Sequence, residues 1–288
     1  MRIAFLGFGL IGGSVARALR RDSAPPESTL VAWTPSGVGA RQAVADGILD
    51  VVAGSPQEAV ERAGLIVLAA PALDCLGLLD GLGGPWRAAL AQDATVTDVA
   101  STKAAILALA ESHGLPFVGG HPMAGRETAG YAASTDDLFV ERPWVVIPSR
   151  SATDRDVAAV EWLARACGAR PLRMDAATHD AAVAGISHLP LVLAAALVEA
   201  VAGAGTSRPF APDLTAGGWR DMTRLARGDV AMGAGIAATN GDALADRIRD
   251  IRTVLDGWLV DLDGPDGADV EALTTRLRAA HARLLELD

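Results

Sequence analysis

The sequence contains few cysteines, no run of basic residues and no long apolar run. Only Cys75 and Cys167 occur, and their spacing is not that of metal ligands, which argues against a disulfide framework and favours a reducing cytoplasm. The net charge of −10 and the pI near 5.0 argue against a nucleic-acid partner, because phosphate binding needs a basic face.

Targeting and membrane segments are also not expected. The chain enters a predicted strand within a few residues of Met1, which leaves no room for a signal peptide. The most apolar segment, Leu189–Val198, is bracketed by His188 and Glu199 and is too short to cross a bilayer. We therefore predict that this segment is a buried helix and that the protein has no membrane partner.

A glycine pattern near the N-terminus indicates a dinucleotide site. Gly7, Gly9 and Gly12 follow the strand-like run Arg2–Leu6 and fit G-x-G-x-x-G, with Leu10 and Ile11 opening a helix. In this context Gly7 permits a tight turn, Gly9 lets the backbone approach a pyrophosphate, and Gly12 allows close packing of helix on strand. The pattern predicts NAD as the cofactor, and a purely structural glycine turn is the alternative.

The ribose-binding acid expected after the second strand is missing. The strand Leu30–Trp33 is followed by Thr34 where an NAD-binding domain usually carries Asp or Glu. Without a carboxylate to repel a 2′-phosphate, NADP becomes an alternative cofactor, with Ser36 or Arg41 as contacts. Alternatively, Thr34 or a backbone group binds the ribose of NAD.

Alternating strand and helix patterns predict a Rossmann-type doubly wound, mostly parallel sheet over residues 1–173. Residues 174–288 show only helix patterns, interrupted at Pro190, and we expect them to form an all-α substrate and dimerisation domain. Apolar helix faces of this extent predict a homodimer. The expected strands of the first domain are Arg2–Leu6, Leu30–Trp33, Leu65–Ala69, Thr95–Val99, Phe117–Val118, Trp144–Ile147 and Pro171–Met174.

A glycine-rich stretch in the middle of the chain carries a candidate catalytic histidine. Gly119 and Gly120 predict a turn or a close approach to a ligand, and Pro122 keeps His121 extended at the end of a strand. Ligands bind in the crevice at that end of an open α/β sheet, although an incidental exposed histidine is the alternative. Ser101, after another strand, either caps the next helix or offers its hydroxyl to the crevice.

The chain resembles the prephenate/arogenate dehydrogenase family of tyrosine biosynthesis over nearly its whole length. The resemblance is carried by short motifs in the order that the family has them. They are Gly7–Ser14 (GFGLIGGS), Asp98–Lys103 (DVASTK), Gly119–Gly130 (GGHPMAGRETAG), His179–Pro190 (HDAAVAGISHLP) and Gly217–Ala226 (GGWRDMTRLA).

This resemblance implies an oxidative decarboxylation with hydride transfer to a nicotinamide cofactor, no metal, and a small-molecule substrate. By motif position, His121 matches the catalytic histidine and Ser101 the serine near the substrate hydroxyl and nicotinamide. Arg224 matches the arginine that holds a substrate carboxylate, and His188 a substrate-side histidine. Arg126 is an additional candidate for a carboxylate contact.

Several of these residues have structural alternatives. His188 could be a satisfied core histidine, and Arg126 could face solvent. The pair His179 and Asp180 is interpreted as the start of a helix rather than as chemistry. Leu191 stands where many relatives carry a further histidine, so any role of that histidine is absent here.

Three alternatives to this function concern the substrate, the type of oxidoreductase and the presence of catalysis. Prephenate is preferred to arogenate because no acid can be placed opposite the arogenate ammonium. Another oxidoreductase with this architecture, of the β-hydroxyacid dehydrogenase or imine reductase type, need not carry Ser101, His121 and Arg224 together. A cofactor-sensing protein without catalysis is the alternative of a different class.

Overall fold

The computed structural model describes residues 1–23, 28–126, 128–203, 211–265 and 267–287 of the chain. The chain forms two compact units, Met1–Gly241 and Asp242–Asp288. The first unit contains the whole sheet and the candidate site, and each unit is described by itself.

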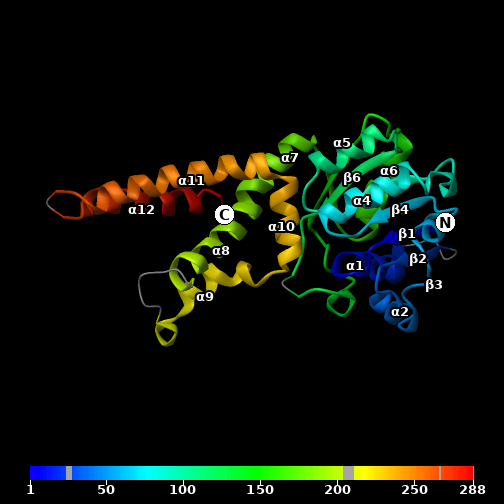
Figure 1. Cartoon of the computed structure of the whole chain (residues 1–288), viewed down its shortest axis with the longest axis horizontal. Coiled ribbons are helices and arrows are strands. Elements are labelled where there is room, and N and C mark those ends of the chain that lie inside the picture. The colour runs from blue at the N-terminus through cyan, green and yellow to red at the C-terminus, as the bar shows by residue number, and fades with distance from the viewer. Residues whose placement is uncertain (24–27, 127, 204–210, 266, 288) are drawn as a thin grey trace. The chain divides into compact units, whose positions relative to one another are not determined.

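One eight-stranded sheet organises the first unit, in the order β3-β2-β1-β4-β5-β6-β7-β8 (Figure 1). All neighbouring strands run parallel except β6 and β7, which are antiparallel. The chain order reverses between β1 and β4, and ligands bind at such a switch point in open α/β sheets. The strands are β1 Arg2–Leu6, β2 Thr29–Trp33, β3 Val51–Val52, β4 Leu65–Leu68, β5 Thr95–Asp98, β6 Phe117–Pro122, β7 Pro143–Pro148 and β8 Arg170–Arg173.

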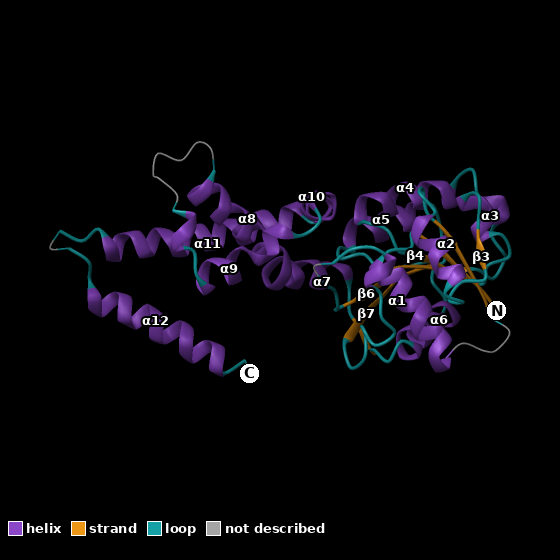
Figure 2. Ribbon diagram, turned by 90° about the horizontal axis from the view of Figure 1, so that it is seen from below, coloured by secondary structure: helices purple, strands orange, loops and turns teal. Residues whose placement is uncertain are grey.

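Helices cover both faces of this sheet (Figure 2). One core cluster joins α1, α2 and α6 to one face, with Val15, Ala40 and Val157 among its buried residues. The second cluster joins α3, α4 and α5 to the other face. The predicted doubly wound fold class is therefore confirmed. The helices are α1 Leu10–Ala18, α2 Val38–Ala45, α3 Pro56–Val60, α4 Ala72–Gly83, α5 Ala104–Ser112 and α6 Asp154–Ala166.

Local sequence signals explain several of these elements. Ser55 caps α3 by accepting a hydrogen bond from the Glu58 N–H at 3.1 Å. Pro56 occupies the first turn, where its missing N–H costs no hydrogen bond within the helix. Every residue of β4 is buried, as its unbroken apolar sequence predicts for a strand covered on both faces.

The glycine pair before His121 does not form the predicted turn. Gly119 and Gly120 lie inside β6, which continues in extended form to Pro122. Their missing side chains admit neighbouring groups instead. A Cβ on Gly120 would lie 2.5 Å from the backbone oxygen of Asp98, and one on Gly119 would lie 3.3 Å from the Lys103 side chain. The glycines are required by close packing at the end of β5.

Only helices follow β8 in the described residues, as the sequence predicts. α7 (Ala176–Val183) continues through a π-helical turn, Ala184–His188, into α8 (Leu189–Ala202). Pro190 lies in the first turn of α8, so the chain accommodates the missing N–H by widening the preceding turn. After residues outside the described range, α9 (Gly217–Thr223), a 3₁₀ turn at Arg224–Arg227 and α10 (Val230–Thr239) follow.

The apolar α8 is not the buried helix that the sequence led us to expect. Only Ala194 is buried along it within the single chain. The continuous helix Ala176–Ala202 is long and apolar enough to cross a membrane by length and composition, with 22% of its most apolar window buried. The apolar run Leu189–Val198, on which the expectation was based, is too short to cross a bilayer. The helix itself is longer, because α7 and the π turn continue into α8.

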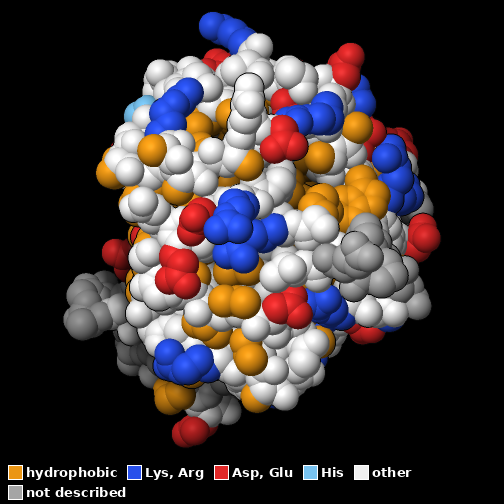
Figure 3. Space-filling model, turned by 90° about the vertical axis from the view of Figure 1, so that its right-hand side faces the viewer, with side chains coloured by type: hydrophobic (Ala, Val, Ile, Leu, Met, Phe, Trp, Pro, Cys, Tyr) orange, Lys and Arg blue, Asp and Glu red, His pale blue; other side chains and the backbone are white. Residues whose placement is uncertain are grey.

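The second unit is a helical hairpin made of α11, which begins at Gly241 and ends at Leu262, and α12 (Val270–Leu285). The Arg276 side chain of α12 forms an ion pair with Asp261 of α11, and its guanidinium lies 6.0 Å from the ring centre of Trp258. Figure 3 draws a face of the first unit instead, on which acidic and basic side chains are interspersed.

The close packing at Gly120 predicts the effect of adding a methyl group. Gly120→Ala should lower the free energy of unfolding by about 1–3 kcal/mol, because the obstructing atom is backbone and cannot rotate away. Gly125→Ala is the matched control, since no heavy atom lies within 4 Å of its added Cβ. Chemical denaturation measures both changes, and equal stability of the two variants would contradict this account of the glycine pair.

Candidate active site

The turn between β1 and α1 has the geometry of a phosphate-binding glycine loop. Gly7 has φ of +91°, and a Cβ there would lie 2.4 Å from the Ala69 oxygen on β4's carboxyl side. A Cβ on Gly12 would lie 3.0 Å from that of Ala69, so helix and strand approach closely at this point. By contrast, Gly9 faces open space, and no side chain caps α1 there. Backbone N–H groups at Leu10 and Ile11 therefore remain available to an anion.

A hydrogen-bonded turn follows β2 at the position where the acid is missing. The Thr34 hydroxyl accepts a hydrogen bond from the Gly37 N–H at 2.9 Å, which closes a turn in which Gly37 has φ of +64°. The exposed Arg41 donates to the Ser36 carbonyl at 3.0 Å. A guanidinium thus lies in the loop where a dinucleotide's ribose is bound in this fold.

Ser101 does not cap the helix that follows it. α5 begins at Ala104, and its first N–H groups are bound by a residue from another helix. The Asp180 carboxylate accepts from the Lys103 N–H at 2.9 Å and from the Ala104 N–H at 2.8 Å. Of the two alternatives for the Ser101 hydroxyl, the capping role is therefore wrong, and the half-buried side chain lies at the carboxyl end of β5.

His121 ends a chain of buried hydrogen bonds. Its Nδ1 lies 2.8 Å from Nε2 of His179, and Nδ1 of His179 lies 2.7 Å from Oδ1 of Asp180. His121 is only 9% exposed, and the two rings meet edge to face at 78°. The interpretation of His179 and Asp180 as merely the start of a helix misses that both side chains are buried, that His179 binds His121 and that Asp180 binds His179.

A buried ion pair supports the strand that carries His121. The Lys103 ammonium, 1% exposed, pairs with Asp98 and donates to the Gly120 carbonyl at 2.8 Å. Asp98 in turn accepts from the Gly120 N–H at 3.0 Å and from the Ala100 N–H at 3.0 Å. Lys103 is the only lysine in the sequence. The pair fixes β6 against the end of β5, next to the histidine.

His188 lies in the π turn and is 1% exposed. Its Nδ1 lies 3.1 Å from the Asn240 side-chain amide, which also donates to the Asp180 carbonyl at 2.8 Å. Nε2 of His188 is buried without a hydrogen-bond partner among the described residues. Asn240, which sequence reasoning did not identify, therefore links α10 to the histidine-bearing helices.

The two arginines of the predicted site lie on other elements of the first unit. Arg224 begins the 3₁₀ turn that packs against α8. Arg126 is exposed and donates to the Thr135 hydroxyl at 3.2 Å, within the segment after β6. The hydrogen bonds above thus bring His121 together with His179 and Asp180, whereas Arg224 is placed by helix packing.

Burial favours the neutral forms of His121 and His188. Burial lowers the pKa of His121 well below its usual value, and the nearby Lys103 charge lowers it further. Burial also lowers the pKa of His188 to about 4, against the attraction of Asp180. For Asp180, burial raises the pKa, but hydrogen bonds from His179 and the two N–H groups outweigh it, so the pKa lies below its usual range.

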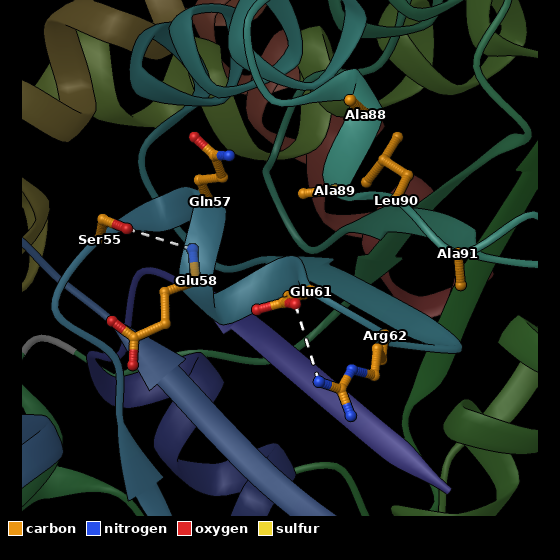
Figure 4. A pocket seen from close by; sticks show the side chains of 9 residues that line it. All are labelled: Ser55, Gln57, Glu58, Glu61, Arg62, Ala88, Ala89, Leu90 and Ala91. Atoms are coloured by element: carbon orange, nitrogen blue, oxygen red, sulfur yellow. Dashed lines mark hydrogen bonds and ion pairs between the residues drawn. The ribbon is translucent and has the colours of Figure 1, made fainter.

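A large cavity lies at the other end of the sheet. It has a volume of about 710 Å³ and is lined by residues of and around α3 and by Ala88–Ala91 (Figure 4). These segments lead into the amino ends of β4 and β5. Because ligands bind at the carboxyl ends in this fold class, the cavity is not the candidate site.

Comparison with known proteins gives the family. The model for the nucleotide-binding domain of prephenate dehydrogenase matches residues 15–172, and the model for its dimerization domain matches residues 175–258. The chain belongs to the prephenate dehydrogenase family. The resemblance inferred from the sequence motifs is therefore confirmed, and the chain is an NAD(P)-dependent dehydrogenase of tyrosine biosynthesis.

Individual relatives agree with this family. The prephenate dehydrogenase of Bacillus subtilis is 31% identical over 265 residues, covering 91% of this chain and 68% of that protein. A crystal structure of prephenate dehydrogenase from Aquifex aeolicus, in complex with hydroxyphenyl propionate and NAD⁺, has a TM-score of 0.86. It is 25% identical and covers 100% of this chain and 98% of that one. Synechocystis arogenate dehydrogenase has a TM-score of 0.78 and is 30% identical, covering 99% and 100%.

Proposed function

We propose that the protein converts prephenate to 4-hydroxyphenylpyruvate, with His121 accepting the proton of the substrate hydroxyl. The buried chain from His121 to Asp180 is the observation that carries this proposal, since it ends at the carboxyl edge of the sheet, the same edge at which the glycine turn follows β1. A neutral imidazole with one nitrogen committed inward has its other nitrogen available to a substrate.

The protein's part in this reaction is to orient the substrate and to hold one proton. A bound nicotinamide supplies the acceptor for the hydride from the ring carbon that bears the hydroxyl. His121 takes the hydroxyl proton as the carbon–oxygen double bond forms, and returns it to the phenolate oxygen after carbon dioxide has left. Aromatisation of the ring provides the driving force.

Other residues would fix the substrate. An arginine pairs with a carboxylate through two parallel hydrogen bonds, which suits Arg224 for a substrate carboxylate and Arg126 for a second contact. The Ser101 hydroxyl, which is not used as a helix cap, would lie between the substrate hydroxyl and the nicotinamide. We retain His188 as a substrate-side residue because its Nε2 has no partner in the described protein.

NAD is the proposed cofactor, and NADP is the alternative cofactor. Gly7, Gly9 and Gly12 with the first turn of α1 would bind the pyrophosphate, and Thr34 the ribose. The absence of a carboxylate at Thr34 and the position of Arg41 support tolerance of a 2′-phosphate.

A homodimer would cover the apolar helices of the C-terminal part. α8 is largely uncovered within one chain, and the matched family model is a dimerization domain. We place the boundary between cofactor and dimerisation domains at 173/174, where the last strand ends. The two free, buried cysteines support the cytoplasm as the location.

Arogenate is the second candidate substrate, favoured by the similarity to Synechocystis arogenate dehydrogenase. A spectrophotometric assay with prephenate or arogenate, each paired with NAD or NADP, tests the function. Turnover of prephenate supports the proposal. Turnover of arogenate alone would contradict it and would identify the protein as an arogenate dehydrogenase. Binding of nucleotide without any turnover would instead indicate a cofactor-sensing protein.

Replacing the catalytic histidine should affect turnover rather than binding. His121→Asn should lower kcat by about 10²–10⁴-fold, the usual contribution of a positioned base, with an unchanged Kd for NAD.

Arg224→Ala should instead raise KM for prephenate by about 10–100-fold, as expected for the loss of a charged hydrogen-bonded pair. Steady-state kinetics measures both, with the exposed His281→Asn as control. Full turnover by the first variant would remove His121 from the mechanism.

An acid at the end of β2 should change cofactor preference. Thr34→Asp should lower kcat/KM for NADP at least about tenfold relative to NAD, because a carboxylate there would repel a 2′-phosphate. Gln42→Glu adds the same charge at an exposed position of α2 and should leave the ratio unchanged. If both variants behave alike, the ribose is recognised elsewhere.

A further inference from the structure

The buried contacts behind His121 fix the direction of the hydrogen bond between His179 and Asp180, and with a single hydrogen on the His179 ring they fix the next bond as well. The starting point is Asp180, which accepts two N–H groups at the beginning of α5. Those donors and the positive end of the helix favour the ionised carboxylate, which can only accept hydrogen bonds. The hydrogen on Nδ1 of His179 must therefore point to Asp180.

The remaining directions follow from this one. With its hydrogen on Nδ1, a neutral His179 presents a lone pair on Nε2, 2.8 Å from Nδ1 of His121. His121 must then carry its own hydrogen on Nδ1 in order to complete that bond. A neutral imidazole holds one hydrogen, so Nε2 of His121 is left with a lone pair.

Charged and titratable groups around His121 favour this neutral form. Lys103, in the segment between β5 and α5, presents a buried ammonium paired with Asp98. His179 of α7 contacts His121, and Asp180 of the same helix contacts His179. His188 lies in the π turn after α7. Burial and the Lys103 charge disfavour a second proton on the ring, as the lowered pKa of His121 reflects.

We propose that Asp180 and His179 are positioning residues that hold His121 as the tautomer with hydrogen on Nδ1 and a lone pair on Nε2. The opposite tautomer would present an N–H to the substrate hydroxyl and could not accept its proton. This inference rests on the proposed function for its catalytic consequence, but the tautomer itself is a property of the protein alone.

The first test reads the tautomer directly. In protein labelled with ¹⁵N-histidine, two-dimensional NMR distinguishes a protonated ring nitrogen from one with a lone pair, and the His121→Asn variant assigns the signal. We expect His121 near pH 7.5 to be protonated on Nδ1 alone. A hydrogen on Nε2 would overturn the proposal. The tautomer is read in the wild-type protein, and the variant serves only to assign the signal.

The second test removes the anchoring charge. Asp180→Asn should lower kcat by about 10–100-fold, the usual effect of removing a residue that orients another, with little change in KM. Loss of the carboxylate should also lower the pKa of His121, so the acid limb of the pH profile should move to lower pH. A merely structural defect would scale the profile without moving it, and such scaling would count against the proposal.

The matched control lies in the same helix. Asp175 is exposed and caps α7 by accepting from the Thr178 N–H at 2.9 Å, and asparagine caps a helix about as well. Asp175→Asn should therefore leave both kcat and the profile unchanged. If wild-type protein shows the expected tautomer but turns over neither prephenate nor arogenate, the proposed function fails while the positioning role stands.

Discussion

The carboxylate of Asp180 is the contact on which the arrangement of the site depends. It accepts the first N–H groups of α5 and the imidazole of His179 at the same time, and it is almost completely buried. An unpaired carboxylate in this position would be very costly, so the three donors must stay together. This requirement joins α7 to the helix that follows β5, and it thereby connects the helical part of the chain to the edge of the sheet where His121 lies.

A second buried charge pair acts on the other side of His121. Lys103 and Asp98 hold the backbone of Gly120 on both its N–H and its carbonyl, which fixes the residue immediately before the histidine. The same ammonium disfavours a proton on the imidazole. Lys103 thus helps to fix the residue before His121, and its charge adds to burial, which is the larger cause of the lowered pKa of His121. A glycine is needed at this point of the strand because a side chain at Gly120 would displace the Asp98 backbone.

Sequence patterns predicted the parts of the fold that depend on local periodicity. β1 was predicted with the bounds it has, and the cap at Ser55 and the helical second half follow from spacing alone. Of the two alternatives for the glycine pair, a turn or a close approach to a ligand, the turn was wrong, because these glycines pack against a neighbouring strand and a buried lysine. The buried state predicted for α8 was wrong for a similar reason, since burial along it is decided by which surfaces pack against it.

The same distinction explains what was missed at the site. His121 could be found because glycine and proline mark its strand end. Nothing near His179, Asp180 or Asn240 in the sequence indicates that His179 contacts His121, that Asp180 binds His179 and that Asn240 binds the Asp180 carbonyl. A histidine followed by an aspartate at a helix start has an ordinary capping explanation, and here that explanation was nearly right. Asp180 does cap a helix, but the helix is α5 rather than its own. Capping a distant helix favours the ionised form of the Asp180 carboxylate. An ionised carboxylate only accepts hydrogen bonds, so it orients the ring of His179, and His179 in turn orients the ring of His121.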